Sequence, residues 1–258
     1  MAGTKSKFVR NVLNFYDQGL NNAFPSGVWA DCPLQAIATD PSVGFVFFED
    51  FAGPMQGDAT ATTNLDGWVV TQATAGAVDL SITAPGGVLE IDSASTTATQ
   101  GINLQAIETT SFIPAADKDI WFEARWKIVD TYNKCELFVG LSAADTTIIA
   151  GSDMTAADHV GFECHTDDGV VLFGAEKAGT EATPLTSNTI AEDTYVRTGF
   201  KINGVTDIEH WVDGTKASTT HLTANIPIVA MCASFVCQSG GTNDPIMHLD
   251  YVKCVQLR

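Results

Sequence analysis

From Val43 to the end of the chain, hydrophobic and polar residues alternate with a period of two. Between Phe122 and Ile128 every even-numbered position is apolar, while Glu123, Arg125 and Lys127 occupy the odd positions. Successive side chains of a strand point to opposite faces, so this pattern predicts a strand with one buried face. It also places Trp126 inward and Trp121 outward. Residues 196–203 repeat the pattern, with Val196, Thr198, Phe200 and Ile202 on one face.

Further apolar or alternating runs are separated by turn signals such as Pro85-Gly86-Gly87 and Asn203-Gly204. They predict strands over residues 43–51, 67–71, 78–83, 87–92, 101–107, 134–142, 158–164, 169–175, 206–213, 226–236 and 246–257. Short strands at this spacing, without helical patterns between them, predict an all-β, two-sheet antiparallel β-sandwich of the jelly-roll type. Helix is suggested only around Met154–Asp158 in this part of the chain.

Residues 1–42 differ from the predicted sandwich domain of residues 43–258, and we expect them to form an N-terminal arm. Apolar residues from Phe8 to Phe15 are spaced to line one side of a short helix. A mobile tail is the alternative, but an arm that becomes ordered on a neighbouring subunit is favoured. The residues expected to bind that partner are Lys5, Lys7, Phe8, Arg10 and Phe15.

The chain is acidic, with a net charge of −18, and its charged residues are unevenly distributed. After Arg10 the next basic residue is Lys118, with only acidic charges between them. Nucleic-acid binding needs clustered cations, so we expect no nucleic-acid partner and no anionic membrane partner. The start of the chain has no apolar run typical of a secretory signal, and no stretch of about 18 apolar residues predicts a membrane span.

Six cysteines are widely spaced and include no C-x-x-C pair, so neither a zinc ribbon nor a redox motif is indicated. We expect them to be reduced and mostly buried, where they act as small apolar residues. Disulfides remain the alternative.

Four segments resemble, in order, the concanavalin-like lectin and glucanase superfamily, which includes laminin-G-like modules. They are Phe48-Glu49-Asp50-Phe51 with Gly67-Trp68, residues 121–128 with Leu137-Phe138-Val139-Gly140-Leu141, Trp211-Val212-Asp213-Gly214, and Leu249-Asp250-Tyr251-Val252-Lys253. The resemblance covers residues 45–257 and implies a concanavalin-like jelly roll. Because the motifs are short, it supports a fold rather than an activity.

Enzymes of that superfamily carry a Glu-x-Asp-x-Glu strand in the sugar cleft. The nearest match here is Glu90-Ile91-Asp92-Ser93-Ala94, in which the second glutamate is missing. Glycoside hydrolysis needs two carboxylates that flank the bond. We therefore expect no catalytic residues, no cofactor and no enzymatic activity, and Glu90 and Asp92 are interpreted as surface acids.

Metal-ligand residue types are found at His159, Glu163, Cys164 and His165. In a strand, Glu163 and His165 would point to one face and Cys164 to the other, so the residues cannot all reach one ion. No metal site is therefore assigned. Calcium is kept as an alternative at Asp167-Asp168-Gly169 and Asp213-Gly214, although turn chemistry accounts for the same residues.

These features lead to the expectation of a non-enzymatic structural protein that decorates or cements a bacteriophage capsid through its arm and sandwich edges. Its expected partners are the major capsid protein or another virion protein. The chain is also expected to form a homo-oligomer, for which a trimer is one arrangement considered. It would be located on the virion after assembly in the host cytoplasm. The first alternative is a carbohydrate-binding, lectin-like module, and the second is a polysaccharide-cleaving enzyme.

Overall fold

The structure is a computed structural model of the chain. It describes residues 27–52, 67–72, 87–106, 111–130, 132–149, 154–155, 157–165, 168–218 and 220–258. For residues 5–9, 12–16, 64–65 and 77–80 it describes the backbone alone. All statements below concern these residues.

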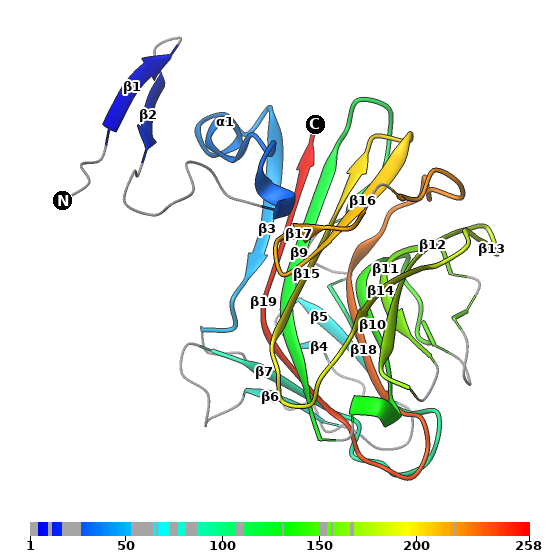
Figure 1. The fold of residues 1–258 in the computed structure, drawn as a ribbon. Coiled ribbons are helices and arrows are strands. Elements are labelled where there is room, and N and C mark those ends of the chain that lie inside the picture. The colour runs from blue at the N-terminus through cyan, green and yellow to red at the C-terminus, as the bar shows by residue number, and fades with distance from the viewer. Residues whose placement is uncertain are drawn as a thin grey trace.

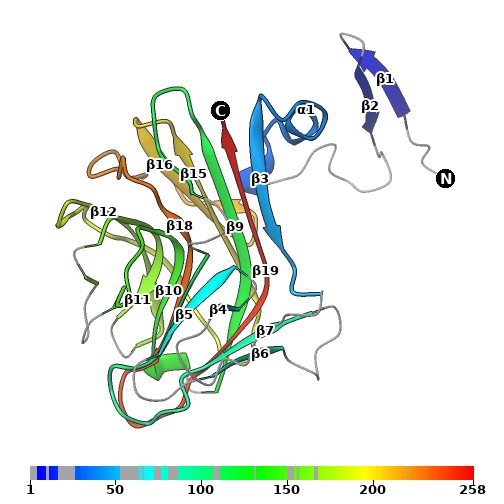
Figure 2. The ribbon, with the colours of Figure 1, turned by 180° about the vertical axis from the view of Figure 1, so that it is seen from behind.

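Two antiparallel sheets face each other and form the body of the molecule (Figures 1 and 2). The larger sheet has the order β13 (Thr180–Glu181), β12 (Val170–Lys177), β11 (His159–Cys164), β10 (Cys135–Ser142), β18 (Cys232–Ser239), β8 (Gln100–Gln105), β5 (Trp68–Gln72) and β4 (Asn64–Leu65), with β14 (Leu185–Thr189) also paired to β12. The smaller sheet has the order β17 (Thr215–Lys216), β16 (Asp207–Val212), β15 (Val196–Asn203), β9 (Ile120–Val129), β19 (Ile246–Leu257), β7 (Leu89–Asp92) and β6 (Ala77–Leu80), with β3 (Gly44–Glu49) also paired to β19. The predicted all-β sandwich is confirmed.

Aromatic side chains from both sheets fill the space between the layers. Phe122 and Phe200 of the smaller sheet stack with ring centroids 4.8 Å apart. Phe173 of the larger sheet lies 5.7 Å from Phe200, and Phe162 lies 4.9 Å from Phe173. Aromatic pairs of this kind stabilise a core beyond the area that they bury. The alternation predicted for β9 is thereby confirmed, because its even-numbered residues from Phe122 to Ile128 all lie in this core.

The outer face of the smaller sheet is covered by the segment that precedes β3. This segment contains a short 3-10 helix, η1 (Gly27–Trp29), and the helix α1 (Leu34–Thr39). Val28 and Ile37 pack with Trp121 and Val255 in a second buried cluster. The Trp121 indole donates a hydrogen bond of 2.9 Å to Asp31. The predicted division of the chain at residue 42 stays a prediction, but residues 27–40 contact the sandwich.

Two details of the predicted secondary structure are wrong. Backbone pairing between β1 (Lys5–Val9) and β2 (Val12–Tyr16) forms an antiparallel hairpin where a short helix was predicted. The side chains of Lys5, Lys7, Phe8 and Phe15 and the whole of Arg10 lie outside the described residues, so their expected partner binding is untested. In the suggested helix, Met154 instead forms a β-bridge with Ile149.

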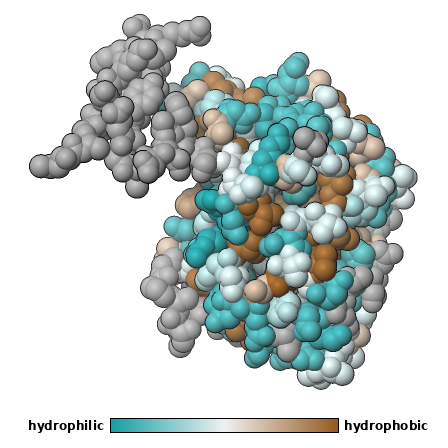
Figure 3. Space-filling model, in the orientation of Figure 1, coloured by the Kyte–Doolittle hydropathy of each residue, from teal (hydrophilic) through white to brown (hydrophobic). Residues whose placement is uncertain are grey.

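Hydrophobic residues also occur at the surface, in keeping with a charged content of only 17%. In the view of Figure 3 they gather near the centre of the described surface, among hydrophilic residues. Large exposed examples include Phe48 on β3 and Ile228. Among the described residues, no helix has the length and hydrophobicity that a membrane crossing requires.

The cysteines are free thiols, and all except the partly exposed Cys32 are buried. Burial raises the pKa of the Cys232 thiol to about 11 and that of the Cys32 thiol to about 12. Both thiols are therefore protonated and weakly nucleophilic at neutral pH, which agrees with the expectation that they act as small apolar residues.

His210 of β16 is a titratable residue within the aromatic core. Its ring stacks on Phe173 with centroids 4.5 Å apart, and neither ring nitrogen has a hydrogen-bond partner among the described residues. Burial lowers the pKa of His210 to about 4. The folded state therefore keeps this imidazole neutral, whereas the unfolded chain binds a proton near the ordinary pKa of about 6.5.

We predict that His210 makes the protein less stable as the pH falls from 6.5 to 4. A depressed folded-state pKa gives full stability above 6.5, and the loss on acidification amounts to about 3 kcal/mol at pH 4. Chemical denaturation of both proteins across this pH range should show that the free energy of unfolding falls by about 3 kcal/mol more in the wild type than in His210→Phe. His221→Gln, which removes an exposed imidazole, should follow the wild type. Parallel profiles for wild type and His210→Phe would contradict the prediction.

Candidate functional site

The outer face of the larger sheet, which points away from the aromatic core, carries an unusual set of buried polar residues. In β11, Val160, Phe162 and Cys164 point into the core. Strand alternation therefore places His159 and Glu163 together on the outer face, although both are fully buried. The prediction that Cys164 and Glu163 point to opposite sides is confirmed.

A row of three glycines crosses the middle of this face. Gly140 of β10, Gly161 of β11 and Gly174 of β12 lie in register on adjacent strands. A Cβ atom at Gly161 would lie 2.7 Å from the Phe138 ring, and one at Gly174 would lie 2.7 Å from Oε1 of Glu163. The missing side chains thus provide the space in which Phe138 and Glu163 lie flat on the sheet.

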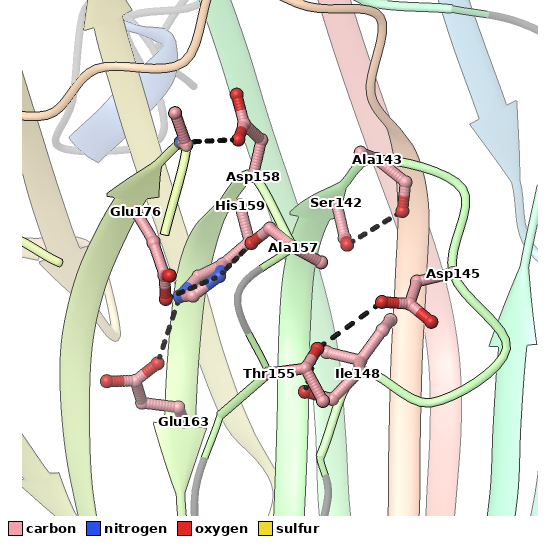
Figure 4. A network of polar contacts seen from close by, with 11 residues as sticks. Ser142, Ala143, Asp145, Ile148, Thr155, Ala157, Asp158, His159, Glu163 and Glu176 are labelled. Atoms are coloured by element: carbon pink, nitrogen blue, oxygen red, sulfur yellow. Dashed lines mark hydrogen bonds and ion pairs between the residues drawn. The ribbon is translucent and has the colours of Figure 1, made fainter. Parts of the chain in front are cut away.

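His159, Glu163, Glu176 and Glu181 form a cluster at one end of the glycine row (Figure 4 shows the first three). Nε2 of His159 lies 3.4 Å from Oε2 of Glu163, and Nδ1 lies 3.9 Å from Oε2 of Glu176. Glu181 is paired with Glu176 across β12 and β13. One ligand-type atom from each of His159, Glu163 and Glu181 lies within 4.8 Å of the other two.

The electrostatics of the cluster are dominated by burial and by like charges. Desolvation, followed by the neighbouring Glu163 carboxylate, raises the pKa of Glu181 to about 7. Burial would lower the pKa of His159, but the carboxylates around it outweigh this effect and raise the pKa. Both shifts reflect an excess of carboxylates over basic side chains in the cluster.

A polar pocket of about 160 Å³ lies further along the same face. It is bordered by β5, β8 and β18 and by the segment 146–149. Asn103 holds this segment in place, since its Nδ2 donates a 2.6 Å hydrogen bond to the Asp145 carbonyl. Its Oδ1 is buried and has no hydrogen-bond partner among the described residues. Gln238, which also lines the pocket, donates a hydrogen bond to Glu136.

An apolar cluster made of Phe138, Ile148, Ile149 and Val236 is also found on this face. Phe138 contacts the His159 ring edge to face at 5.6 Å, while Ile148, Ile149 and Val236 line the polar pocket. The apolar cluster therefore lies between the acidic cluster and the pocket.

The acids singled out in the sequence lie elsewhere. Glu90 and Asp92 belong to β7 of the smaller sheet, where Glu90 contacts Nε2 of His248 at 3.1 Å. The carboxylates of the candidate calcium loops accept backbone hydrogen bonds: Asp168 from the Val170 amide within its own turn, and Asp213 from the Arg197 amide on β15. Asp167 lies outside the described residues. Calcium binding at these loops stays untested.

Sequence reasoning missed Glu176 and Glu181 because it considered only residues close to Glu163 in the chain. A signal was nevertheless present. His159 and Glu163 are four residues apart in a predicted strand, and the Asp167–Gly169 turn signal predicts that the next strand pairs with it. That hairpin places Glu176 directly opposite His159.

No protein-family model and no curated protein matches the chain. Solved structures do resemble it. A protein of unknown function from Shewanella oneidensis has a TM-score of 0.57 at 15% identity, over 84% of this chain and 87% of its own. A Bacillus licheniformis β-glucanase has a TM-score of 0.55 at 16% identity, over 81% and 97%. A Bacteroides ovatus mixed-linkage glucan GH16 protein, solved with its product, has a TM-score of 0.55 at 12% identity, over 81% and 99%.

These comparisons correct one expectation. The sequence led us to expect a protein that is not an enzyme, but β-glucanases share this architecture at TM-scores of about 0.55. The incomplete motif at Glu90 was a poor basis for that expectation, because β7 is not part of the sheet that carries the buried Glu136, Glu163 and Glu176. The roles expected on a capsid, with their partners and location, stay predictions. At identities of 12–16% the likeness shows the fold alone: the chain has the same sandwich architecture as these proteins.

Proposed function

We propose that the protein binds a neutral polysaccharide on the outer face of its larger sheet, in the pocket next to Asn103. The observation that carries this proposal is the side chain of Asn103, which lines the pocket with further polar groups and whose buried Oδ1 has no hydrogen-bond partner among the described residues. A buried acceptor without a hydrogen bond is costly, so a ligand hydroxyl at this position would be favourable.

The composition of the pocket suits a sugar better than an anion. Its polar lining consists of hydroxyls and amides: Thr71, Gln72, Thr99, Asn103, Thr146, Thr147 and Gln238. Such groups donate and accept hydrogen bonds, as pyranose hydroxyls do. No lysine or arginine lines the pocket in the part of the chain that the structure describes, and Ile148 and Ile149 supply apolar contacts for the face of a sugar ring.

The structural neighbours support the proposal of one class of polysaccharide. They include the B. licheniformis β-glucanase and a β-1,3-1,4-glucanase with a TM-score of 0.54 at 13% identity. We therefore propose a β-linked glucan as the bound chain. The assembly role expected for the arm is not carried into this proposal, since the side chains of the arm lie outside the described residues.

Cleavage of the bound chain is the second candidate function. Two carboxylates interact with residues that line the pocket: Glu136 accepts a hydrogen bond from Gln238, and Asp145 accepts one of 2.9 Å from the Thr147 amide. Paired carboxylates are the usual requirement for glycoside hydrolysis. If the protein cleaves its ligand, Glu136→Gln should abolish the release of reducing ends from barley β-glucan without weakening binding.

For binding itself, we predict that the wild type is retarded in native gels containing barley β-glucan, lichenan or laminarin. Thr71→Val removes one pocket hydroxyl with almost no change in shape, and Asn103→Ala removes the unpartnered acceptor. Each should weaken binding about tenfold, equivalent to about 1.4 kcal/mol. Thr206→Val, which makes the same change at an exposed turn, should bind like the wild type. The proposal would be contradicted if, for each of the three glucans, the wild type migrated equally in gels with and without that glucan.

A further inference from the structure

We propose that His159, Glu163 and Glu181 together bind one divalent transition-metal ion of the Zn²⁺ or Mn²⁺ class. The inference is independent of the proposed polysaccharide binding, because the cluster uses none of the residues that line the pocket. It rests on the geometry of the three side chains and on the buried carboxylate of Glu163, neither oxygen of which has a hydrogen-bond partner among the described residues.

The spacing of the donor atoms matches that of a metal site. With metal–ligand bonds of about 2.1 Å in a tetrahedral arrangement, neighbouring ligand atoms lie about 3.4 Å apart. Nε2 of His159 and Oε2 of Glu163 are separated by 3.4 Å. The donor atom of Glu181 lies within 4.8 Å of both. Glu181 is exposed on the two-residue strand β13, so a rotation of its side chain can complete the set.

The orientation of His159 is that of a metal ligand. Its Nδ1 lies 2.8 Å from the Ala157 carbonyl oxygen, which fixes the proton on Nδ1 in the neutral ring (Figure 4). The lone pair of Nε2 then faces Glu163. Metal-bound histidines typically donate their other N–H to a backbone carbonyl or a carboxylate in this way. Glu176 lies on the Nδ1 side, 3.9 Å from that atom, and would act as a positioning residue.

Glu163 needs a positive partner. A carboxylate without solvent is strongly disfavoured unless it is paired or coordinates a metal. In the described part of the chain, the one basic side chain that contacts Glu163 is His159, and no lysine or arginine forms an ion pair with Glu163 or Glu181. A cation between the three side chains would neutralise both carboxylates. The competing explanation is a proton held within the cluster, either on His159 beside Glu163 or shared between Glu163 and Glu181, and metal titration separates this explanation from a bound metal.

The donor set selects the class of metal. One imidazole nitrogen with carboxylate oxygens suits Zn²⁺ and Mn²⁺, whereas Ca²⁺ prefers oxygen ligands throughout. Gly174 contributes to the site by its lack of a side chain, because a Cβ there would collide with Oε1 of Glu163. The glycine thus keeps Glu163 at the distance from His159 that a shared metal needs.

The test is calorimetric titration of the full chain with ZnCl₂, MnCl₂ or CaCl₂ after chelator treatment. A Cys32→Ser background removes the one partly exposed thiol. We expect saturable binding of one Zn²⁺ or Mn²⁺ per chain and at least tenfold weaker binding of Ca²⁺. Glu181→Gln should weaken Zn²⁺ binding at least tenfold and abolish the rise in Tm that Zn²⁺ produces. Glu192→Gln, which changes an exposed glutamate outside the cluster, should bind like the background protein.

Gly174→Ala provides a second, independent variant. The new methyl group displaces the Glu163 carboxylate, so Zn²⁺ binding should weaken at least tenfold while circular dichroism still shows a folded β-protein. Absence of saturable Zn²⁺ and Mn²⁺ binding in the background protein would overturn the proposal in favour of a proton held within the cluster. Unchanged Zn²⁺ binding in Glu181→Gln or in Gly174→Ala would overturn it as well.

Discussion

The whole structure depends on the burial of one aromatic layer between two sheets. Phe122 and Phe200 from one sheet meet Phe162 and Phe173 from the other, and the regular alternation of each strand follows from that contact. A shift of register by a single residue would move these rings to the outside and carry polar side chains inward. The strong hydrophobic driving force on the inner faces therefore fixes what each outer face presents.

On the smaller sheet, the outer face is used for folding. Trp121 and Val255 are covered by residues 27–40, and charged side chains such as Lys201 are paired across the surface with Asp31 and Asp119. The outer face of the larger sheet is different. Its buried polar atoms include several without a hydrogen-bond partner among the described residues, namely Oδ1 of Asn103, Nε2 of His159 and both carboxylate oxygens of Glu163. In a native protein such groups call for an explanation, and a ligand is a direct one. Both proposals made above concern this face.

How far the sequence predicts the structure can be judged from particular elements. Strands 246–257 and 121–128 were predicted almost to the residue. The second has a long alternating run with one apolar face, whereas the alternation of the first shifts at an irregularity between Leu249 and Tyr251. β13 and β17 are two residues long, too short to show any period, and β14 is a polar strand without an apolar face. The chain between Lys5 and Tyr16 shows the limit of spacing arguments, since a few apolar residues fit a helix or a hairpin equally well.

The candidate site was only partly predictable for a related reason. The sequence shows which side of β11 each residue faces, and this was enough to separate Cys164 from Glu163. It does not show which residues a partner strand brings alongside, and the cluster depends on β12 and β13 for Glu176 and Glu181. Buried acids also run against the general expectation that charged residues are solvated, so composition alone favours a surface interpretation.

The row of Gly140, Gly161 and Gly174 has a consequence for how this protein can diversify. A stretch of sheet three strands wide has bare backbone on one side, while the opposite side of the same strands holds Val139, Val160 and Phe173 in the core. Replacing a glycine together with the side chain that overlies it would reshape the outer surface and leave the interior unchanged. Homologous chains could thus acquire different ligands at this position while keeping the same scaffold.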